Sequence, residues 1–390
     1  MIRLVVAGIF LALITFWLHR RLVRAPGLTG RAAIAADLAL VALLVIALLG
    51  SLSGTELDPA WVRPFGFVGW TWLAAVFYLV LGSLAIGLVC LGARLVRRVR
   101  RTGPADEPAD ETVGPSRRHV LRWATGVLVV ASVGAVGYGT VEASRPRIVP
   151  TRVPLRRLPP GFDGLRVALV TDLHVGPARG AAFVRRVVDL VNGQNPDLIV
   201  LSGDLVDGTI AFVGSDLEPL RDLQAPLGVF GVSGNHEYYA DDALSWLDHW
   251  ETLGVRTLRN EHVVLARGGD EIVLAGIHDY SAPPPHAADL AAALKGRDPG
   301  RFVLLAAHQP RHVYEARDHG VDLQLSGHTH GGQMWPIRYL VPLANPVLTG
   351  LDRFGDTLVY TSQGAGAWGP PVRIATPPEV SILELVSSDE

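Results

Sequence analysis

Hydrophobic residues are concentrated at the start of the chain, in four blocks that contain no charged side chain: residues 4–18, 38–55, 64–93 and 123–141. A helix needs about 20 residues to cross the hydrocarbon core of a bilayer, so the blocks have suitable lengths for transmembrane helices. The first block is long enough when its flanking residues are included, since arginine side chains can extend to the membrane surface. Four such blocks argue against buried helices of a soluble domain. They predict transmembrane helices at about residues 2–18, 32–52, 66–93 and 123–141.

The arginines between these blocks predict the orientation of the helices. Two connecting loops are rich in arginine, and their residues are Arg20, Arg21, Arg24 and Arg31, then Arg94, Arg97, Arg98, Arg100, Arg101, Arg117, Arg118 and Arg122. The loop between the second and third helices contains Glu56, Asp58 and a single arginine, Arg63. Arginine-rich loops stay in the cytoplasm. The sequence therefore predicts a multi-pass protein of the cell membrane whose residues after 141 lie outside the cytoplasm.

The loop before the fourth helix has two further features. Residues 101–116 are rich in Pro, Asp and Glu, which predicts a solvated cytoplasmic linker. Residues 116–122 contain Arg117 and Arg118 ahead of an apolar stretch and resemble a twin-arginine export signal. The alternative is an ordinary pair of arginines at the cytoplasmic end of a helix. Both interpretations place the C-terminal region outside the cytoplasm.

The hydrophobic pattern changes after residue 141. Residues 142–160 are rich in Pro and Arg and predict a stalk. From residue 161 to residue 390, short apolar runs alternate with segments of helical period. Residues 165–171 predict a buried strand and residues 181–191 an amphipathic helix. Further strands are predicted at residues 198–202, 229–233, 272–277, 302–307, 323–326, 358–362 and 380–385. The fold class is an N-terminal α-helical transmembrane region followed by an α/β domain.

Composition narrows the chemistry that this domain can carry. Charged residues make up 18% of the chain, below the usual quarter, which agrees with lipid contact. The formal net charge of -2 provides no general attraction for nucleic acid, so we expect no nucleic-acid partner. The single cysteine, Cys90, excludes an intramolecular disulfide and a cysteine-rich zinc site. The 13 His and 37 Asp and Glu residues are left as candidate metal ligands.

Polar clusters follow five of the predicted strands. They are Asp-Leu-His at 172–174, Gly-Asp-Leu-Val-Asp at 203–207, Gly-Asn-His-Glu at 234–237, His-Gln-Pro at 308–310 and Gly-His-Thr-His-Gly-Gly-Gln at 327–333. In open α/β sheets, ligands bind outside the carboxyl ends of the strands, so the five clusters predict one site. Carboxylate, imidazole and amide ligands suit Mn, Fe, Co, Ni or Zn. Gly203, Gly234 and Gly327 allow backbone torsions and close approaches that a Cβ atom would obstruct.

Taken together and in this order, the clusters resemble the motifs of the calcineurin-like metallophosphoesterase superfamily: D-x-H, G-D-x-x-D, G-N-H-E, an isolated H, and G-H-x-H. The resemblance covers about residues 161–390 and points to a membrane-anchored phosphodiesterase of bacterial type. It implies a sandwich of two β-sheets flanked by helices. It also implies a dinuclear metal centre, in which one ion is bound by Asp172, His174 and His330, the other by Asn235, His308 and His328, and both by Asp204. His236 would be the catalytic histidine that contacts the phosphate and protonates or stabilises the leaving oxygen.

The resemblance implies hydrolysis of a phosphoester by a hydroxide that two divalent ions activate, since such ions lower the pKa of a shared water toward about 7. A membrane tether favours a lipid-linked substrate, namely a phospholipid or a cell-envelope phosphoester, and we expect a diester rather than a monoester. One alternative is a transporter or channel with a regulatory metal-binding outer domain. Against it, Asp37 is the only acidic residue within a predicted span. Another alternative is a non-catalytic binding module, but no ligand of the motifs is missing.

Several residues beside the motifs have two interpretations. Asp207 either orients a metal ligand or caps the next helix, and Glu237 and Gln333 either contact the site or serve their turns. Asp216 is expected to be a cap or turn residue, and His278, which follows a predicted strand, is a further candidate for the site. Four aromatic residues either line a substrate cleft or pack in the core: Tyr238, Tyr239, Trp335 and Trp368.

Overall fold

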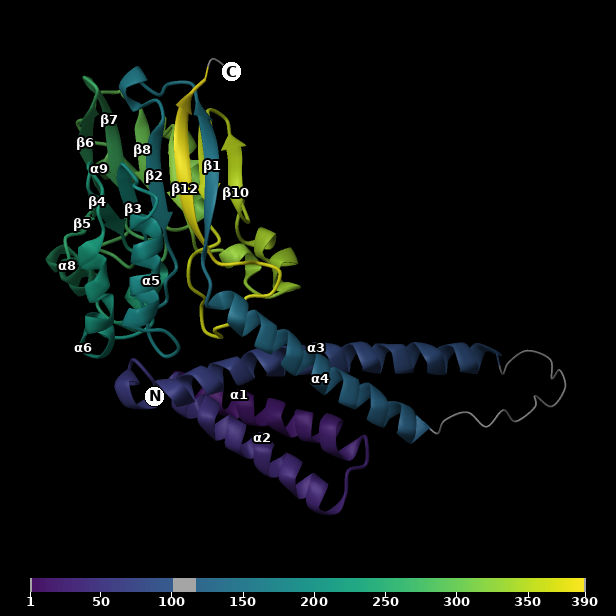
Figure 1. Ribbon diagram of the computed structural model, residues 1–390. Helices are drawn as coiled ribbons and strands as arrows, with labels where there is room; N and C mark the ends of the chain where they lie inside the picture. The colour runs from purple at the N-terminus through teal and green to yellow at the C-terminus, as the bar shows by residue number, and fades with distance from the viewer. Residues whose placement is uncertain (1, 101–116, 389–390) are drawn as a thin grey trace. The chain divides into compact units, whose positions relative to one another are not determined.

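The computed structural model describes residues 2–100 and 117–388 of the 390-residue chain (Figure 1). Its internal contacts divide the chain into two compact units. The helical unit comprises Met1–Ser51 and Val68–Tyr138, and the C-terminal unit comprises Leu52–Phe67 and Gly139–Glu390. The C-terminal unit therefore includes the loop between the second and third long helices, the first turns of the third and the last turn of the fourth.

Four long helices dominate the helical unit. They are α1 (Ile2–Leu18), α2 (Gly30–Ser51), α3 (Pro59–Arg100) and α4 (Arg117–Ala143), with a π-helical turn, η1 (His19–Arg24), after α1. Within the described residues, these four are long and apolar enough to cross a membrane. Large apolar side chains are exposed along them, for example Phe10 at 61% and Val89 at 73%. An apolar surface of this extent requires a lipid or protein environment.

The helices extend beyond the apolar blocks that predicted them. α3 begins at Pro59 instead of residue 66 and ends at Arg100 instead of residue 93, and α4 begins at Arg117 instead of residue 123. Arginine has a high helix propensity, so a helix can continue where the apolar pattern stops. The predicted linker, residues 101–116, lies outside the described residues. In α2, Asp37 Oδ1 lies 2.6 Å from His19 Nδ1 and therefore has a polar partner.

Twelve strands of the described chain form two six-stranded sheets in the C-terminal unit, with the orders β1-β12-β2-β3-β4-β5 and β10-β11-β9-β8-β7-β6. The strands of the first sheet are β1 (Arg147–Leu155), β2 (Leu165–Val170), β3 (Leu198–Ser202), β4 (Val229–Val232), β5 (Arg256–Thr257) and β12 (Glu379–Ser387). Those of the second are β6 (Glu261–Arg267), β7 (Asp270–Gly276), β8 (Val303–Ala306), β9 (Leu323–Ser326), β10 (Gly350–Phe354) and β11 (Thr357–Thr361). The strands that precede the motifs are parallel, β2 to β4 in one sheet and β8 to β9 in the other.

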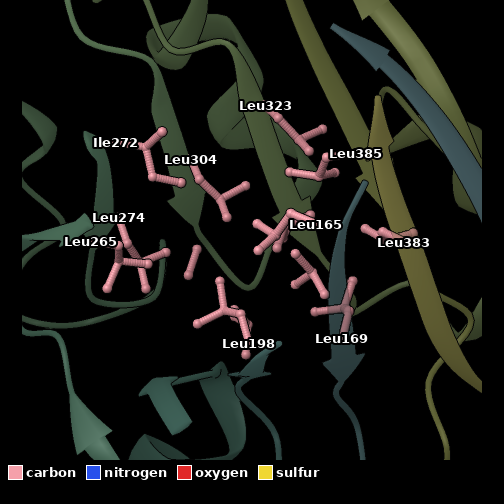
Figure 2. Close-up of a cluster of buried hydrophobic side chains, with 14 of the residues drawn as sticks. Leu165, Leu169, Leu198, Leu265, Ile272, Leu274, Leu304, Leu323, Leu383 and Leu385 are labelled. Atoms are coloured by element: carbon pink, nitrogen blue, oxygen red, sulfur yellow. The ribbon is translucent and has the colours of Figure 1, made fainter. Parts of the chain in front are cut away.

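The main core lies between the two sheets. Leu169 and Leu198 of the first sheet are buried in one cluster with Leu274, Leu304 and Leu323 of the second (Figure 2). Helices cover the outer faces: α5 (Ala181–Asn192) and α8 (Ala243–Thr252) pack on the first sheet, and α9 (Leu290–Ala293) and α10 (Val313–Asp318) pack on the second. The C-terminal unit is thus the predicted two-sheet sandwich flanked by helices.

Residues 142–160 differ from the stalk that the sequence predicts. α4 continues to Ala143, and β1 occupies residues 147–155 in parallel pairing with β12. Pro150 and Pro154 argue against a central strand, but β1 lies at the edge of its sheet, where the missing N–H of a proline need not leave a neighbour unpaired. Only residues 144–146 separate the last turn of α4 from the first strand of the sandwich.

Candidate metal centre

Seven predicted ligand side chains stand on five loops at the carboxyl ends of parallel strands. Each loop places its first ligand two or three residues after the end of β2, β3, β4, β8 or β9. All of these side chains except His328 belong to buried residues, and His328 is half-buried. The structure brings together Asp172, His174, Asp204, Asn235, His308, His328 and His330.

Asp172, His174 and His330 form the first cluster, with candidate ligand atoms within 4.8 Å of one another. Nε2 of His330 lies 3.2 Å from Asp172 Oδ1 and 3.0 Å from Nε2 of His174. The two imidazole nitrogens point into the same space, and a neutral imidazole nitrogen without a proton is an acceptor. The side chains are therefore arranged as they would be around a shared cation.

Asp204, His308 and His328 form the second cluster. Nε2 of His308 lies 3.1 Å from Asp204 Oδ2 but makes no hydrogen bond. Nδ1 of His308 contacts the Ser202 carbonyl oxygen at 2.7 Å, so in the neutral ring Nδ1 donates and Nε2 is an acceptor. The Asn235 amide oxygen is also buried without a hydrogen-bond partner. Buried acceptors without donors are costly, and a cation would satisfy them. The residues present therefore fit a divalent metal centre.

Asp204 belongs to the second cluster and also approaches the first. Its Oδ2 atom is 3.1 Å from His308 Nε2 and 3.9 Å from His174 Nε2. Its Oδ1 atom accepts a hydrogen bond from the His236 backbone N–H at 2.8 Å. A single carboxylate can thus reach both groups of candidate ligands.

The loops hold several ligands in a backbone conformation that only glycine adopts freely. Positive φ angles occur at Asp172 (57°), His174 (48°), Asp204 (54°), His328 (70°) and His330 (51°). Each costs on the order of 1–3 kcal/mol and persists only where surrounding contacts enforce it. The first two loops supply such contacts, since the Asp172 N–H donates to the Gly203 oxygen and the His174 N–H to the Asp204 oxygen.

Close approach explains two of the motif glycines. A Cβ atom at Gly234 would overlap the carboxylate of Asp204, and one at Gly327 would overlap that of Asp172. Both positions must therefore remain glycine for the carboxylates to keep their places.

Carboxylates and histidines shift one another's pKa values in this site. Burial favours the neutral carboxyl, but the neighbouring histidines hold the pKa values of Asp172 and Asp204 below their ordinary range. Burial disfavours a charged His174, yet Asp207 and then Asp172 raise the pKa of His174 to about 10. Burial lowers the pKa of His330 to about 3. A metal ion that binds His174 must therefore displace a proton.

Asp207 supports two histidines from behind the ligands. Its Oδ1 atom lies 2.9 Å from Nδ1 of His174 and 2.7 Å from Nδ1 of His236. The next helix, α6 (Ile210–Val213), has Thr209 at its N-cap position, so the capping interpretation of Asp207 is wrong. Burial opposes a charge on His236, but Asp207 raises the pKa of this imidazole above its usual value. Asp207 is therefore positioned to orient His236 and to favour its protonated form.

Glu237 and Gln333 fasten loops of the site. The buried carboxylate of Glu237 accepts hydrogen bonds from the backbone N–H groups of Gly234, Asp204 and Leu205 at 2.7, 3.1 and 2.8 Å. It thereby ties the loop after β3 to α7 (Asn235–Ala240). The Gln333 side-chain oxygen accepts a hydrogen bond from the Trp368 backbone N–H, and the Gln333 side-chain N–H donates to the Trp368 backbone oxygen, both at 2.8 Å. Glu237 acts through the backbone, whereas Gln333 also lines the cleft described below.

The remaining candidates do not all line the cleft, and Trp335, which is 47% exposed, does not pack in the core either. Tyr239 and Trp368 line the cleft, whereas Tyr238 and Trp335 are not among its walls. His278 contacts the Tyr238 hydroxyl at 3.0 Å, and it does not belong to either cluster of candidate ligands.

Arg373 also belongs to the site, although no sequence motif predicts it. Its fully buried guanidinium donates to the backbone oxygens of His330 at 2.8 Å and Gly366 at 2.9 Å. It thus holds the His330 loop against the loop after β11. A single arginine, 43 residues after His330 in the chain, offers no pattern from which this role could be predicted.

A cleft of about 410 Å³ opens beside the ligands. Its polar lining includes Asp204, Asn235, His236, His328 and His330. The rest is largely apolar or aromatic, and includes Tyr239, Met334, Ile337, Val341, Trp368 and Pro370. The cleft is therefore amphipathic, since candidate metal ligands and apolar side chains both line it.

Comparisons with known proteins agree with this geometry. Residues 165–332 match the family model described as calcineurin-like phosphoesterase. The chain is similar to a transmembrane protein with metallophosphoesterase domain from Danio rerio, with 36% identity over 80% of this chain and 74% of that protein. The protein of the same name from Bos taurus is 36% identical over 73% of this chain and 66% of that protein. A metallophosphoesterase of Helicobacter pylori strain J99 is 40% identical over 71% of this chain and 74% of that protein.

These relatives and the clustered ligands lead to the same assignment. The matched segment contains all seven candidate ligands, and the similarity extends well beyond that segment. Membrane association follows from the four long apolar helices together with relatives named as transmembrane proteins. The chain belongs to the calcineurin-like phosphoesterase family, as a membrane-associated, metal-dependent hydrolase of phosphoric ester bonds.

Proposed function

We propose that the protein is a phosphodiesterase with two divalent metal ions, tethered to the membrane with its active site outside the cytoplasm. The observation that carries this proposal is the position of Asp204, whose Oδ2 atom lies 3.1 Å from His308 and 3.9 Å from His174. Asp172, His174 and His330 would hold one ion, Asn235, His308 and His328 the other, and Asp204 both. When bound, two such ions lower the pKa of a shared water and offset the charge of the phosphate oxygens.

His236 is the general acid of this proposal. It lines the cleft, and its side chain is 14% exposed, so a substrate can reach it. Because Nδ1 of His236 faces Asp207 at 2.7 Å, the other ring nitrogen is available to give a proton to the leaving oxygen. Burial opposes a charge on His236, but Asp207 raises the pKa of this imidazole, which favours the protonated form that a general acid needs.

The lining of the cleft favours a diester over a monoester. Among the described residues that line it, none is Arg or Lys. A monoester carries a second negative charge, which proteins usually bind with these two residue types. A diester carries one charge and two substituents, and the apolar lining around Ile337 and Val341 would accept the second substituent. We therefore expect a phospholipid or a cell-envelope phosphoester as the substrate.

Two observations support an extracytoplasmic C-terminal unit. The arginines lie in the loops before α2 and before α4, which the positive-inside rule assigns to the cytoplasm. Leu52–Phe67, which comprises the loop between α2 and α3 and the first turns of α3, belongs to the same compact unit as the sandwich. In this unit Arg63 of α3 pairs with Asp216, and the Thr209 N–H donates to the Gly54 oxygen at 2.8 Å. These contacts support a topology in which both segments lie on one side of the membrane, which agrees with four spans.

Substrate panels and reporter fusions test the proposal. The full-length protein in detergent, stripped of metal and then reloaded with each candidate ion, should hydrolyse bis-p-nitrophenyl phosphate faster than p-nitrophenyl phosphate. A faster monoester rate would reject the diesterase assignment. A reporter that is active only outside the cytoplasm should work when fused after Ser144 and fail after Pro104, and the reverse pattern would place the active site in the cytoplasm.

A further inference from the structure

Residues 335–345, here called the rim segment, follow the ligand loop of His330 and form two short 3-10 turns, η6 (Ile337–Tyr339) and η7 (Val341–Leu343). Large apolar side chains of the rim segment are exposed: Tyr339 at 68%, Leu340 at 63% and Leu343 at 84%. Its only charged residue is Arg338. Soluble surfaces rarely expose so many large apolar side chains together, so such a patch indicates a binding partner.

The rim segment also contributes to the cleft. Ile337 and Val341 line it, whereas Tyr339, Leu340 and Leu343 do not. Two further aromatic residues of the lining, Tyr239 and Trp368, are 62% and 58% exposed. The rim segment therefore contributes both to the lining of the cleft and to an exposed apolar surface next to the cleft.

The contacts of the rim segment lead directly to the end of α4. The Trp335 N–H donates to the Ile374 oxygen at 3.1 Å, and the adjacent Arg373 N–H donates to the oxygen of Gly139 at 2.9 Å. Gly139 belongs to the C-terminal unit, together with the last turn of α4. A Cβ atom at Gly139 would meet the side chains of Val372 and Ile374, so this turn packs closely on the strip that supports the rim segment.

The end of α4 is where the chain leaves the bilayer in the proposed topology. Only three residues, 144–146, lie between the end of α4 at Ala143 and the start of the sandwich at Arg147, so the two can be at most roughly 14 Å apart. The exposed side chains of the rim segment also have the composition of membrane-interface segments, in which tyrosine and leucine accompany a basic residue and acidic residues are absent.

We propose that the rim segment inserts into the bilayer surface and that lipid substrates enter the cleft along it. The headgroup phosphate would reach the ligands, while Ile337 and Val341 contact the apolar part of the same lipid. The bilayer is the occupant that the tie to α4 favours over a second copy of the chain or a partner protein. The substrate-entry part rests on the proposed function, whereas insertion of the rim segment does not.

A depth measurement tests insertion without any reference to activity. Leu343→Cys on a Cys90→Ser background places a single thiol for an environment-sensitive fluorophore in the full-length protein. Val264→Cys is the matched control, since Val264 is a 43% exposed apolar residue on β6. In nanodiscs of phosphatidylcholine and phosphatidylglycerol, brominated lipids should quench the probe at position 343 and leave the probe at 264 unchanged. Equal quenching at both positions, a water-exposed probe at 343, or a shielded probe that brominated lipids do not quench would overturn insertion.

A rate comparison then tests lipid entry. Leu343→Asp should lower hydrolysis of phosphatidylglycerol in nanodiscs by about tenfold or more, because a charged side chain in place of a buried leucine opposes insertion of the rim segment. Its rate on bis-p-nitrophenyl phosphate should stay at the wild-type value, and Val264→Asp should change neither rate. Equal losses on both substrates for Leu343→Asp, or no loss on the lipid, would reject entry along the rim segment. Absence of all diesterase activity in the wild type would instead reject the proposed function and leave the depth result valid.

Discussion

The two units of this protein distribute polar and apolar side chains in opposite ways. In the helical unit, Phe10 and Val89 are exposed at 61% and 73%, whereas in the C-terminal unit Asp172 and His308 are completely buried. Each arrangement is unfavourable in water by itself. Exposed apolar helices require lipid, and buried carboxylates require opposite charges. The comparison indicates that neither unit is suited to water alone. The helical unit requires lipid around its apolar side chains, and the C-terminal unit requires positive charge beside its buried carboxylates.

The strongest test of the contrast removes the charge that both metal ions would share. Asp204→Asn should lower turnover by roughly 10³-fold or more, because a neutral amide cannot neutralise two cations and several kcal/mol of stabilisation are lost. Steady-state rates on bis-p-nitrophenyl phosphate measure the effect, and circular dichroism checks the fold. Asp318→Asn is the matched control, since the Asp318 side chain is 63% exposed and, among the described residues, forms an ion pair only with its neighbour Arg317. Equal losses in the two variants would contradict the assignment.

A second test separates metal binding from proton donation inside the buried polar cluster. His328→Ala and His330→Ala should lower both bound metal and rate. His236→Ala should keep its metal while its rate falls by about 10²–10⁴-fold, the usual contribution of a general acid. The loss should be larger for an alkyl diester than for a nitrophenyl diester, because a nitrophenolate needs little protonation to leave.

Metal content and both rates must be measured on the same preparations. If His236→Ala lost its metal, His236 would be a ligand. If its rate fell equally for both leaving groups, His236 would not be the acid.

Metal removal should sharpen the difference between the two units. A chelator should destabilise the C-terminal unit. A bound ion that is present at 100 times its Kd contributes about 2.7 kcal/mol to the free energy of unfolding, and the chelator removes this contribution. The helical unit should be unaffected, because its contacts involve no candidate metal ligand cluster among the described residues. Hydrogen exchange of the full-length protein should show faster exchange in the loops after β2 and β9 and no change in α2. Faster exchange in α2 would show that metal binding also stabilises the helical unit.

The smallest expected effect concerns the contact between the first turns of α3 and the sandwich. Asp216 pairs with Arg63, and its Oδ1 atom accepts a hydrogen bond from the Ala181 N–H at the start of α5 at 2.9 Å. Asp216→Asn should therefore cost about 0.3–1 kcal/mol through loss of charge at the helix N-terminus. The melting temperature should fall slightly and turnover should persist. A loss of turnover comparable to that of Asp204→Asn would mean that this contact controls the active site.

The sequence by itself determined the features that depend on neighbours along the chain. The lengths of the four segments without charged residues predicted the four apolar helices, because the thickness of the hydrocarbon core sets the length of a membrane-spanning helix. Period and strand-end position predicted an α/β domain with five polar loops at one edge, because parallel strands carry their carboxyl ends to the same edge. The two-sheet sandwich was implied by the family resemblance. The seven candidate ligands were therefore predictable as a group. Their roles in binding metal stay a proposal.

Only the tertiary structure decided features that depend on partners far apart in the chain. The prolines of residues 147–155 made a stalk the natural prediction, and pairing with β12 at the opposite end of the domain made them a strand instead. Asp207 contacts His174 and His236. No local sequence pattern distinguishes an aspartate in this role from one that caps a helix. Arg373 supports His330 across 43 residues. Local sequence determines whether a segment is suited to water, to lipid or to the protein core. The contacts of a side chain depend on packing between segments that are distant in the chain, and no short sequence pattern encodes them.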